Sequence, residues 1–297
     1  TGEGGDELLG GFVRYARARR LAALPAPLRR VAGAGLRTVP VRVWDTVLRR
    51  AARRGRESAD RAIDPGRASA ALSGHRLHAL SALLAEPDDA LRYRDLASVA
   101  VETGALVLGR GPGADASEAE RGRRRWSELD GLDPTGRMML LDQLGYLPDD
   151  ILTKVDRAAM SVALETRIPL LDHRVVALAW RLPPAVRTRG GTAKWPLRAI
   201  AEEHVPAALL DRPKAGFAVP LAAWLRGPLR AWAEDLLDAD ALRRQGLLDA
   251  AGVHRLWREH LTGRRERHNE LWPVLVLQAW LSRRTSPAAT EAPRPTP

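Results

Sequence analysis

The sequence predicts a mainly α-helical protein, and three observations lead to this prediction. Apolar residues recur at helical spacing in most segments of the 297-residue chain, as at Ile151 and Val155. Strand patterning is nearly absent, with one weak candidate at VETGALVLG, residues 101–109. Prolines such as Pro25 end the apolar-periodic segments at helix length, and no internal repeat is present.

The first predicted helix covers residues 6–24. Asp6 and Glu7 suit its first turn because carboxylates complement the positive end of the helix dipole. Pro25 ends it, since proline cannot continue the backbone hydrogen bonding. A basic amphipathic stretch over residues 28–56 follows, and it reads as one or two helices.

A break near Pro40 divides that basic stretch. Two further helices are predicted over residues 67–85 and 88–99. The segment from about residue 103 to 127 contains GRGPGADASEAERGRRR and shows no apolar period. It is therefore predicted to be an exposed, flexible insertion.

Helical patterning returns at residues 134–147 and continues through PDDILTKVDRAAMSVAL, residues 148–164, with Asp149 or Asp150 as the expected N-cap. Asp172 is the expected N-cap of the helix after that. Within residues 148–164, the apolar stripe comprises Ile151, Val155, Ala158 and Val162. Further helices are predicted at 193–204, 221–239, 250–261 and 269–283, with a loop at 211–220 and a disordered tail at 284–297.

The net charge of +11, from 47 basic and 36 acidic residues, raises the question of a nucleic-acid partner. Much of the excess lies within residues 14–67 and 121–125, and no basic strand rich in aromatic residues offers a base-stacking platform. Arginine far outnumbers lysine, which is typical of GC-rich coding and raises the charge without any polyanionic ligand. We therefore expect no nucleic-acid partner.

Cysteine is absent, which excludes disulfides, thiolate metal sites and a cysteine nucleophile within this chain and fits a reducing cytoplasm. No apolar run of about 18 residues is present, so no membrane span is expected. Lysine occurs only at Lys154, Lys194 and Lys214. Because arginine fills the ordinary basic positions, these lysines are candidates for sites that need a compact ammonium group.

The opening stretch TGEGGDE combines glycines with carboxylates. Gly2 and Gly4 allow the backbone to approach a ligand closely, and a turn that enters a helix suits phosphate oxygens. Glu3 and Asp6 beside a phosphate make sense if Mg²⁺ lies between them. Taken alone, the pattern is more typical of a tight turn before an acidic helix start, because a short glycine-rich match is weak evidence.

Two further motifs carry charged candidates. LETRIPLLDHR, residues 164–174, places Glu165 and Arg167 either in a ligand site or at a joint between helices. DRPKAGFAVP, residues 211–220, places Lys214 on a loop, where it could be a mobile phosphate ligand, although the motif alone favours a surface lysine.

Read in order, these motifs resemble the synthetase domain of glutamine-dependent asparagine synthetases. The matching segments are TGEGGDELLGGF, YLPDDILTKVDRAAMSVALETRIPLLDHRVVALAWRLPP, GGTAKWPLR, RPKAGFAVPLAAWLRGPLR and NELWPVLVLQAWL. The resemblance implies an α/β ATP-pyrophosphatase domain, of the adenine nucleotide α-hydrolase-like type, of which residues 1–283 are a mainly α-helical C-terminal part.

The resemblance also implies a reaction that needs ATP and Mg²⁺. In that family the side-chain carboxylate of aspartate attacks the α-phosphorus of ATP, which gives β-aspartyl-AMP and pyrophosphate. Ammonia then displaces AMP and yields asparagine. The ammonia comes from glutamine, hydrolysed in a separate N-terminal domain, and a homodimer is a further expectation.

The resemblance assigns a role to each matching residue. It gives the nucleotide contacts to Thr1, Gly2 and Lys194, the Mg²⁺ ligand to Asp6, and the catalytic roles to Glu3 and Lys214. It gives the amino-acid pocket to Asp156, Arg157, Glu165 and Arg167. Glu3 would be a general base, and Lys214 would stabilise the leaving pyrophosphate.

The chain also departs from the family pattern. The pyrophosphate loop of the form SGGxDS is missing, and GGTAK at residues 190–194 is a different element. The glutaminase domain is missing as well, consistent with the absence of cysteine. We therefore expect a C-terminal fragment that by itself neither adenylates aspartate nor hydrolyses glutamine.

Two alternatives stay open at this point. A paralogue could use the same adenylation to amidate a natural product or to close a β-lactam ring, although residue 3 is Glu and residues 148–174 contain no tyrosine for a cyclase dyad. Independently, residues 14–67 could form a basic helical module that binds nucleic acid with a steep salt dependence.

Overall fold

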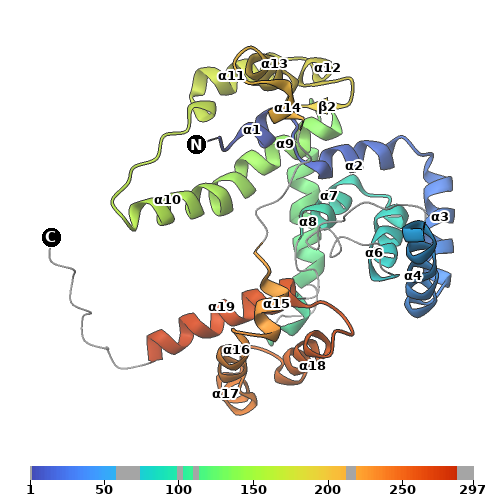
Figure 1. Ribbon diagram of the computed structural model, residues 1–297, viewed down its shortest axis with the longest axis vertical. Helices are drawn as coiled ribbons and strands as arrows, with labels where there is room; N and C mark the ends of the chain where they lie inside the picture. The colour runs from blue at the N-terminus through green and yellow to red at the C-terminus, as the bar shows by residue number, and fades with distance from the viewer. Residues whose placement is uncertain (1, 58–73, 99–102, 110–113, 212–218, 286–297) are drawn as a thin grey trace. The chain divides into compact units, whose positions relative to one another are not determined.

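The computed structural model describes residues 2–57, 74–98, 103–109, 114–211 and 219–285 (Figure 1). Most of them lie in helices, which confirms the mainly α-helical prediction. The strands of the described residues form one short hairpin, in which β1 (Thr188–Arg189) pairs antiparallel with β2 (Thr192–Ala193). No described helix has the length and apolar character that a bilayer crossing requires.

The chain divides into two compact units, residues 1–97 with 118–213 and residues 98–117 with 214–297. The first unit contains α1 (Gly5–Leu8), α2 (Val13–Ala22), α3 (Ala26–Thr38), α4 (Val41–Glu57), α6 (Gly74–Ala85), α7 (Asp89–Ala97), α9 (Pro134–Leu144), η2 (Leu147–Leu152), α10 (Thr153–Met160), η3 (Pro169–Leu171), α11 (His173–Arg181), α12 (Pro184–Arg187), α13 (Trp195–Glu202) and α14 (Ala207–Leu210). Helix α8 (Ala114–Ser127) begins in the second unit and ends in the first. The predicted single domain over residues 1–283 stays a prediction.

The second unit is a small helical bundle with its own apolar core. Its elements are η1 (Thr103–Leu106), α15 (Leu221–Arg226), α16 (Arg230–Leu236), α17 (Ala239–Gln245), α18 (Ala250–Leu261) and α19 (His268–Thr285). The largest buried side chains of this core include Leu225, Leu242, Leu256, Leu271 and Leu275. The predicted helices at 250–261 and 269–283 are confirmed, and Gly227 and Leu237 interrupt the one expected at 221–239.

The helix predicted over residues 6–24 is two helices, so that prediction is wrong. Gly10 has φ +69°, a conformation that favours glycine, and the chain turns between α1 and α2 at this point. The apolar residues on both sides keep a helical period, which hides the break from a periodicity argument. Asp6 and Glu7 do lie in the first turn of a helix, as expected, but of the short α1.

The break at Pro40 is confirmed, because α3 ends at Thr38 and α4 begins at Val41. Helices α3 and α4 both pack against α6, and Figure 1 shows the three side by side. Gly33 permits this approach, since a Cβ at that position would lie 2.8 Å from the Ser81 carbonyl oxygen. Part of the helix predicted at 67–85 lies outside the described residues, as do residues 212–218 of the predicted loop and most of the predicted tail.

Residues 103–127 contain more regular structure than predicted. They include η1 and the helix α8, and Leu106 lies in the core of the second unit. Alanine, glutamate and arginine are strong helix formers, so α8 forms by local propensity without an apolar stripe. Of the strand candidate at 101–109, residues 103–109 are described, and they contain one isolated bridge, between Val107 and Leu248.

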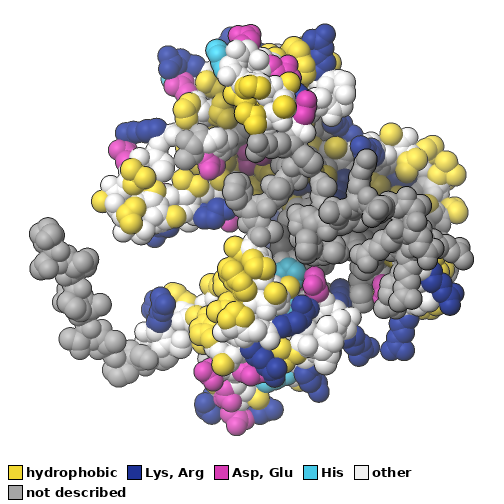
Figure 2. Space-filling model, in the orientation of Figure 1, with side chains coloured by type: hydrophobic (Ala, Val, Ile, Leu, Met, Phe, Trp, Pro, Cys, Tyr) yellow, Lys and Arg dark blue, Asp and Glu magenta, His cyan; other side chains and the backbone are white. Residues whose placement is uncertain are grey.

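The segment after α9 begins differently from the prediction. Neither Asp149 nor Asp150 is an N-cap, because the helix starts one turn earlier as the π-helical turn η2 and continues into α10. Helix α10 has no buried residue, and Val162 beyond its end is 75% exposed. Figure 2 shows hydrophobic side chains on the surface where α10 lies in Figure 1.

A buried carboxylate joins three helices of the first unit. Asp142 of α9 is fully buried and accepts hydrogen bonds from the hydroxyl groups of Tyr15 on α2 and Tyr93 on α7, the latter at 2.6 Å. Arg14 Nε donates to the same carboxylate at 3.0 Å, and its Nη2 forms an ion pair with Oδ2 at 2.7 Å. A buried charge is tolerated only when it is paired and hydrogen-bonded, and here both conditions are met.

The second unit contains a buried imidazole, that of His260. His260 Nδ1 accepts a hydrogen bond from the Arg267 amide at 3.2 Å, so the proton of the neutral ring lies on Nε2 and is donated to the Ala222 carbonyl oxygen at 3.1 Å. Burial lowers the pKa of His260, because the charged form would lose its hydration.

We expect this histidine to make the second unit sensitive to acid. A lowered folded-state pKa contributes stability above the unfolded-state value of about 6.5, and this stability is lost as the pH falls through the folded-state pKa. The thermal midpoint, measured between about pH 7.5 and 5, should therefore fall less in His260→Gln than in the wild type. The exposed His204, changed to Gln, is the control, and an unchanged pH profile in His260→Gln would contradict the assignment.

Candidate functional site

The opening turn fits closely against the leucines of η3. Gly4 has φ +84°, and a Cβ there would lie 2.4 Å from Leu171 Cδ2. A Cβ on Gly5 would lie 3.2 Å from Leu170 Cδ1. Gly4 therefore suits both the backbone conformation and the close packing of this turn, and Gly5 suits the close packing.

Asp6 and Lys194 form an ion pair at this turn. Lys194 Nζ lies 2.9 Å from Asp6 Oδ1, and both side chains are between a quarter and a third exposed. The backbone amide of Lys194 also donates to the Leu9 carbonyl oxygen at 3.3 Å. Two residues that lie far apart in the sequence thus meet at one half-buried position that solvent can reach.

Gly11 makes room for this pair. A Cβ at Gly11 would lie 2.1 Å from Asp6 Oδ1 and 2.3 Å from Lys194 Cε. Distances below 3 Å are not found for real Cβ atoms, so any larger residue would displace one of the two charged side chains. The second glycine of the Gly10–Gly11 turn therefore shapes the site directly, while the first one turns the chain.

The hairpin β1–β2 positions Lys194, which directly follows β2, beside Asp6. Gly190 and Gly191 form its turn with positive φ, and Lys194 itself has φ +54° at the position before α13. A positive φ is strained for lysine and persists only when the surrounding contacts hold it. Here the Asp6 carboxylate and the Leu9 carbonyl supply those contacts.

Helix α9 supports the acidic turn from behind. Gln143 Nε2 donates to the Glu7 carbonyl oxygen at 3.0 Å, and its Oε1 accepts from Trp180 Nε1 at 3.0 Å. The Glu7 side chain is buried, and burial raises its pKa above the ordinary value. Helices α1, α9 and α11 are thereby joined beneath the ion pair.

The residues predicted for the amino-acid pocket lie on the surface. Asp156 and Arg157 of α10 are 66% and 81% exposed, with Arg157 Nε 4.0 Å from Asp156 Oδ2. Glu165 and Arg167 are 71% and 84% exposed and form a 2.8 Å ion pair. All four side chains are therefore open to solvent in the described part of the chain.

The remaining candidates are distributed unevenly. Gly2 is exposed and Glu3 is half-buried on the opening turn, three residues before Asp6. Thr1 and Lys214 lie outside the described residues. Of the predicted site residues, the structure therefore brings Asp6 and Lys194 into contact and places Glu3 on the same turn.

The described residues contain no cluster of three or more His, Cys, Asp or Glu side chains that would hold a metal by itself. Asp6 nevertheless offers a partly exposed carboxylate. Mg²⁺ binds through one or two carboxylates together with substrate phosphates and water, rather than in an all-protein cage. The residues present thus fit a magnesium ion that arrives with a phosphate ligand.

Comparison with known proteins decides the family. The family profile described as asparagine synthase matches residues 1–282, which is almost the whole chain. The chain belongs to the asparagine synthase family. The resemblance drawn from the sequence motifs is therefore confirmed.

Relatives of this family match about half of the chain. A Mycobacterium tuberculosis protein provisionally named as a glutamine-hydrolysing asparagine synthetase is 39% identical over 156 residues, 52% of this chain. Glutamine-hydrolysing asparagine synthetase 1 of Bacillus subtilis is 29% identical over 157 residues, 53% of this chain. The match covers 24% of the length of each relative. No solved structure matches the chain.

Sequence reasoning overlooked the residues that shape the site in this member of the asparagine synthase family. Gly11 was grouped with the opening motif and assigned no role, and Gln143 was not singled out. Two consecutive glycines inside an apparent helix are the sequence signal that could have identified Gly11. Gln143 has no such signal in the nearby sequence, because its hydrogen-bond partners lie on α1 and α11.

Proposed function

We propose that this chain supplies nucleotide-binding and acid-binding residues of an ATP-dependent asparagine synthetase, a carbon–nitrogen ligase with glutamine as the nitrogen donor. The carboxylate of aspartate attacks the α-phosphorus of ATP, the bond to the β,γ-pyrophosphate breaks, and β-aspartyl-AMP forms. Ammonia then attacks the acyl carbon and AMP leaves, which gives asparagine.

The Asp6–Lys194 ion pair is the observation that carries this proposal. A lysine ammonium beside a carboxylate is suited to exchange that partner for phosphate oxygens, which leaves Asp6 for a magnesium ion. Bound Mg²⁺ would neutralise charge on the phosphates of ATP. Lys194 thereby joins Lys214 as a candidate for stabilising the pyrophosphate that leaves.

The other roles follow the family assignment and are part of the proposal. Thr1 and Gly2 contact the AMP moiety, and Glu3 accepts a proton from the incoming ammonia. Asp156, Arg157, Glu165 and Arg167 recognise the amino-acid substrate, since a guanidinium suits its α-carboxylate and a carboxylate its α-ammonium. We also propose an ATP-pyrophosphatase-type α/β domain to which residues 1–283 contribute, a glutaminase domain as ammonia source, a homodimer and a cytoplasmic location.

A chimera tests the proposal. Residues 1–282 replace the corresponding C-terminal segment of the B. subtilis enzyme, so that the upstream part of that enzyme, with the pyrophosphate loop of the family pattern, stays in place. Aspartate-dependent exchange of pyrophosphate into ATP is measured. We expect exchange by the chimera and none by the 297-residue chain alone. Rescue of an asparagine auxotroph distinguishes this function from a paralogue that activates another acid. A folded chimera that exchanges pyrophosphate only with a different acid would contradict the choice of aspartate.

Changing Glu3 to Gln should slow asparagine formation. The amide keeps the size of the side chain and cannot act as a base, so we expect ammonia-dependent asparagine formation to fall about 10²–10⁴-fold. Formation of asparagine by the Glu3→Gln chimera from ammonia is compared with that of a chimera carrying Glu203→Gln, an exposed glutamate near the end of α13. Equal rates for the two variants would remove Glu3 from the chemistry.

A further inference from the structure

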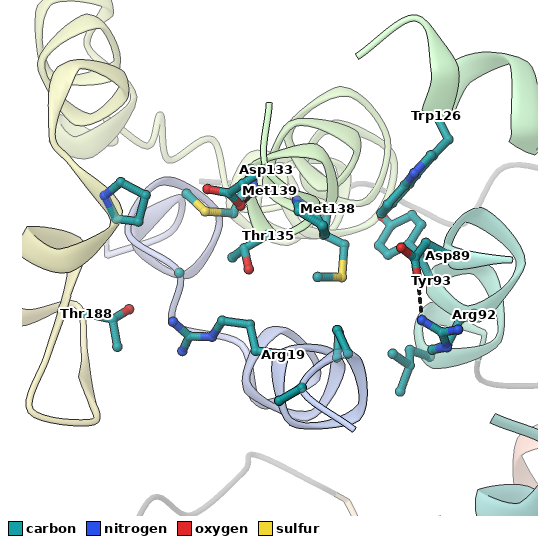
Figure 3. A pocket seen from close by; sticks show the side chains of 18 of the residues that line it. Arg19, Asp89, Arg92, Tyr93, Trp126, Asp133, Thr135, Met138, Met139 and Thr188 are labelled. Atoms are coloured by element: carbon teal, nitrogen blue, oxygen red, sulfur yellow. Dashed lines mark hydrogen bonds and ion pairs between the residues drawn. The ribbon is translucent and has the colours of Figure 1, made fainter. Parts of the chain in front are cut away.

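A cavity of about 360 Å³ lies in the first unit, apart from the Asp6–Lys194 pair. Figure 3 shows its walls, with Met138 and Met139 from α9, Tyr93 from α7 and Trp126 from α8. Arg19 of α2 faces them across the opening. A volume of this size is within the range of small-molecule sites, and the lining is mainly apolar.

Arg187 is the unusual member of this lining. Its residue is 8% exposed, and its Nε is buried without a hydrogen-bond partner. Among the described residues, Nη1 has one hydrogen-bond partner, the weak acceptor Met139 Sδ at 3.5 Å, and the guanidinium lies 5.7 Å from the centre of the Trp180 ring. No described carboxylate forms an ion pair with it, and Asp133 acts on it only at longer range.

Arg92 lines the same cavity and serves as a comparison, because its charge is compensated within the structure. It is also buried, but it is held by the Asp89 carboxylate and by the Glu86 carbonyl oxygen. Figure 3 marks the bond between Arg92 and Asp89 with a dashed line. Arg187 has no comparable partner, and a buried charge without one is costly for the folded state.

We propose that this cavity binds a small organic acid with one carboxylate and an apolar body. The carboxylate pairs with the Arg187 guanidinium, whose planar donors match two carboxylate oxygens. The apolar body lies against Met138, Met139 and Trp126.

The charge in the cavity favours a monoanion over a phosphate. Among the described residues, Arg187 is the one buried guanidinium of this lining without a carboxylate partner. The cavity also contains the negative charge of Asp133, which acts on Arg187 from a distance. Burial lowers the pKa of Arg187, which reflects the same lack of compensation. Arg92 is already paired with Asp89, and Arg19 at the opening is exposed to solvent. A dianion would therefore carry more negative charge than the one buried, unpaired guanidinium offsets.

Binding of 3-phenylpropionate to the 297-residue chain tests the proposal by isothermal titration calorimetry. We expect the acid to bind at least tenfold more tightly than its neutral amide and than phenyl phosphate. Arg187→Met should weaken binding of the acid at least tenfold, whereas Arg181→Met, an exposed arginine at the end of α11, should leave it unchanged. Equal binding of acid and amide, or no loss in Arg187→Met, would overturn the proposal.

The methionines report the location. The chain has three, of which Met138 and Met139 line the cavity and Met160 is 53% exposed on α10. With methyl-labelled methionine, 3-phenylpropionate should shift the NMR signals of the first two and leave the third in place. A shift confined to Met160, or no shift at all, would show that the acid does not occupy this cavity.

Thermal unfolding without ligand separates a binding role from a structural one. If Arg187 is kept for a ligand, Arg187→Met removes an uncompensated buried charge, and the melting temperature stays equal or rises. A clear fall in the melting temperature would instead identify Arg187 as a structural residue and contradict the proposal. Arg187→Lys, which keeps the charge without the planar donors, should bind the acid with intermediate affinity.

Discussion

Asp142→Asn is expected to lower the free energy of unfolding of the first unit by about 3–5 kcal/mol, the range found when one partner of a buried ion pair is removed. Asp142 is fully buried and receives hydrogen bonds from Tyr15, Tyr93 and Arg14. The amide of asparagine offers one acceptor oxygen and no charge to these three donors. Urea unfolding followed by circular dichroism measures the loss.

Asp130→Asn is the matched control. Asp130 pairs with Arg137 at 3.0 Å, but its side chain is 77% exposed. An exposed pair contributes about 0–1 kcal/mol, because water solvates both partners when they separate. If the free energy of unfolding fell equally in the two variants, the burial of Asp142 would add nothing to the stability of the first unit.

The tyrosines give a second readout of the same network. The chain has three, and the pKa of each is raised, chiefly by burial and, for Tyr15 and Tyr93, by the Asp142 charge. A raised folded-state pKa contributes stability below the unfolded-state pKa of about 10, and that stability is lost as the pH rises further. The tyrosinate absorbance of Tyr15 and Tyr93 should therefore appear only together with alkaline unfolding, and at lower pH in Asp142→Asn.

Lys194→Met is expected to lower the rate of pyrophosphate exchange by the chimera about 10²–10³-fold, the loss typical for removal of one positioned group that stabilises transition-state charge. Methionine keeps the length of the side chain and removes the ammonium group that contacts Asp6. The charge on the departing pyrophosphate then lacks this partner. The exchange rate at saturating ATP and aspartate is the measurement.

Lys154→Met provides the comparison for that variant, since Lys154 is an exposed lysine on α10. Its exchange rate should stay close to that of the unmodified chimera. If both variants retain full exchange while remaining folded, Lys194 has no part in forming pyrophosphate, and Lys214 becomes the sole lysine candidate.

Local signals explain which parts of the fold were predictable. Asp172 caps α11 by accepting a hydrogen bond from the Arg174 amide at 2.9 Å, as its position before an apolar-periodic segment predicts. Pro40 breaks the basic stretch for an equally local reason. The split between α1 and α2 was missed because apolar periodicity continues across Gly10, and α8 was missed because its sequence has helix propensity without periodicity.

The site was predictable only through the order of its motifs. Nothing local connects Asp6 with Lys194, because the two residues lie on α1 and at the end of the hairpin that precedes α13. The burial of Asp142 and the lack of a partner for Arg187 depend on packing between distant helices, and no spacing rule reports such packing. The sequence motifs indicated which residues carry the chemistry, and the structure showed which residues hold them in place.

The exposure of α10 has a consequence for how this protein tolerates change. Because α10 contributes no buried side chain, substitutions at Asp156 and Arg157 remove almost no packing energy. If these residues recognise the acid, selectivity and fold stability are encoded in separate sets of residues. Substrate preference is then free to diverge by single mutations among descendants of this protein, without a compensating change in its core.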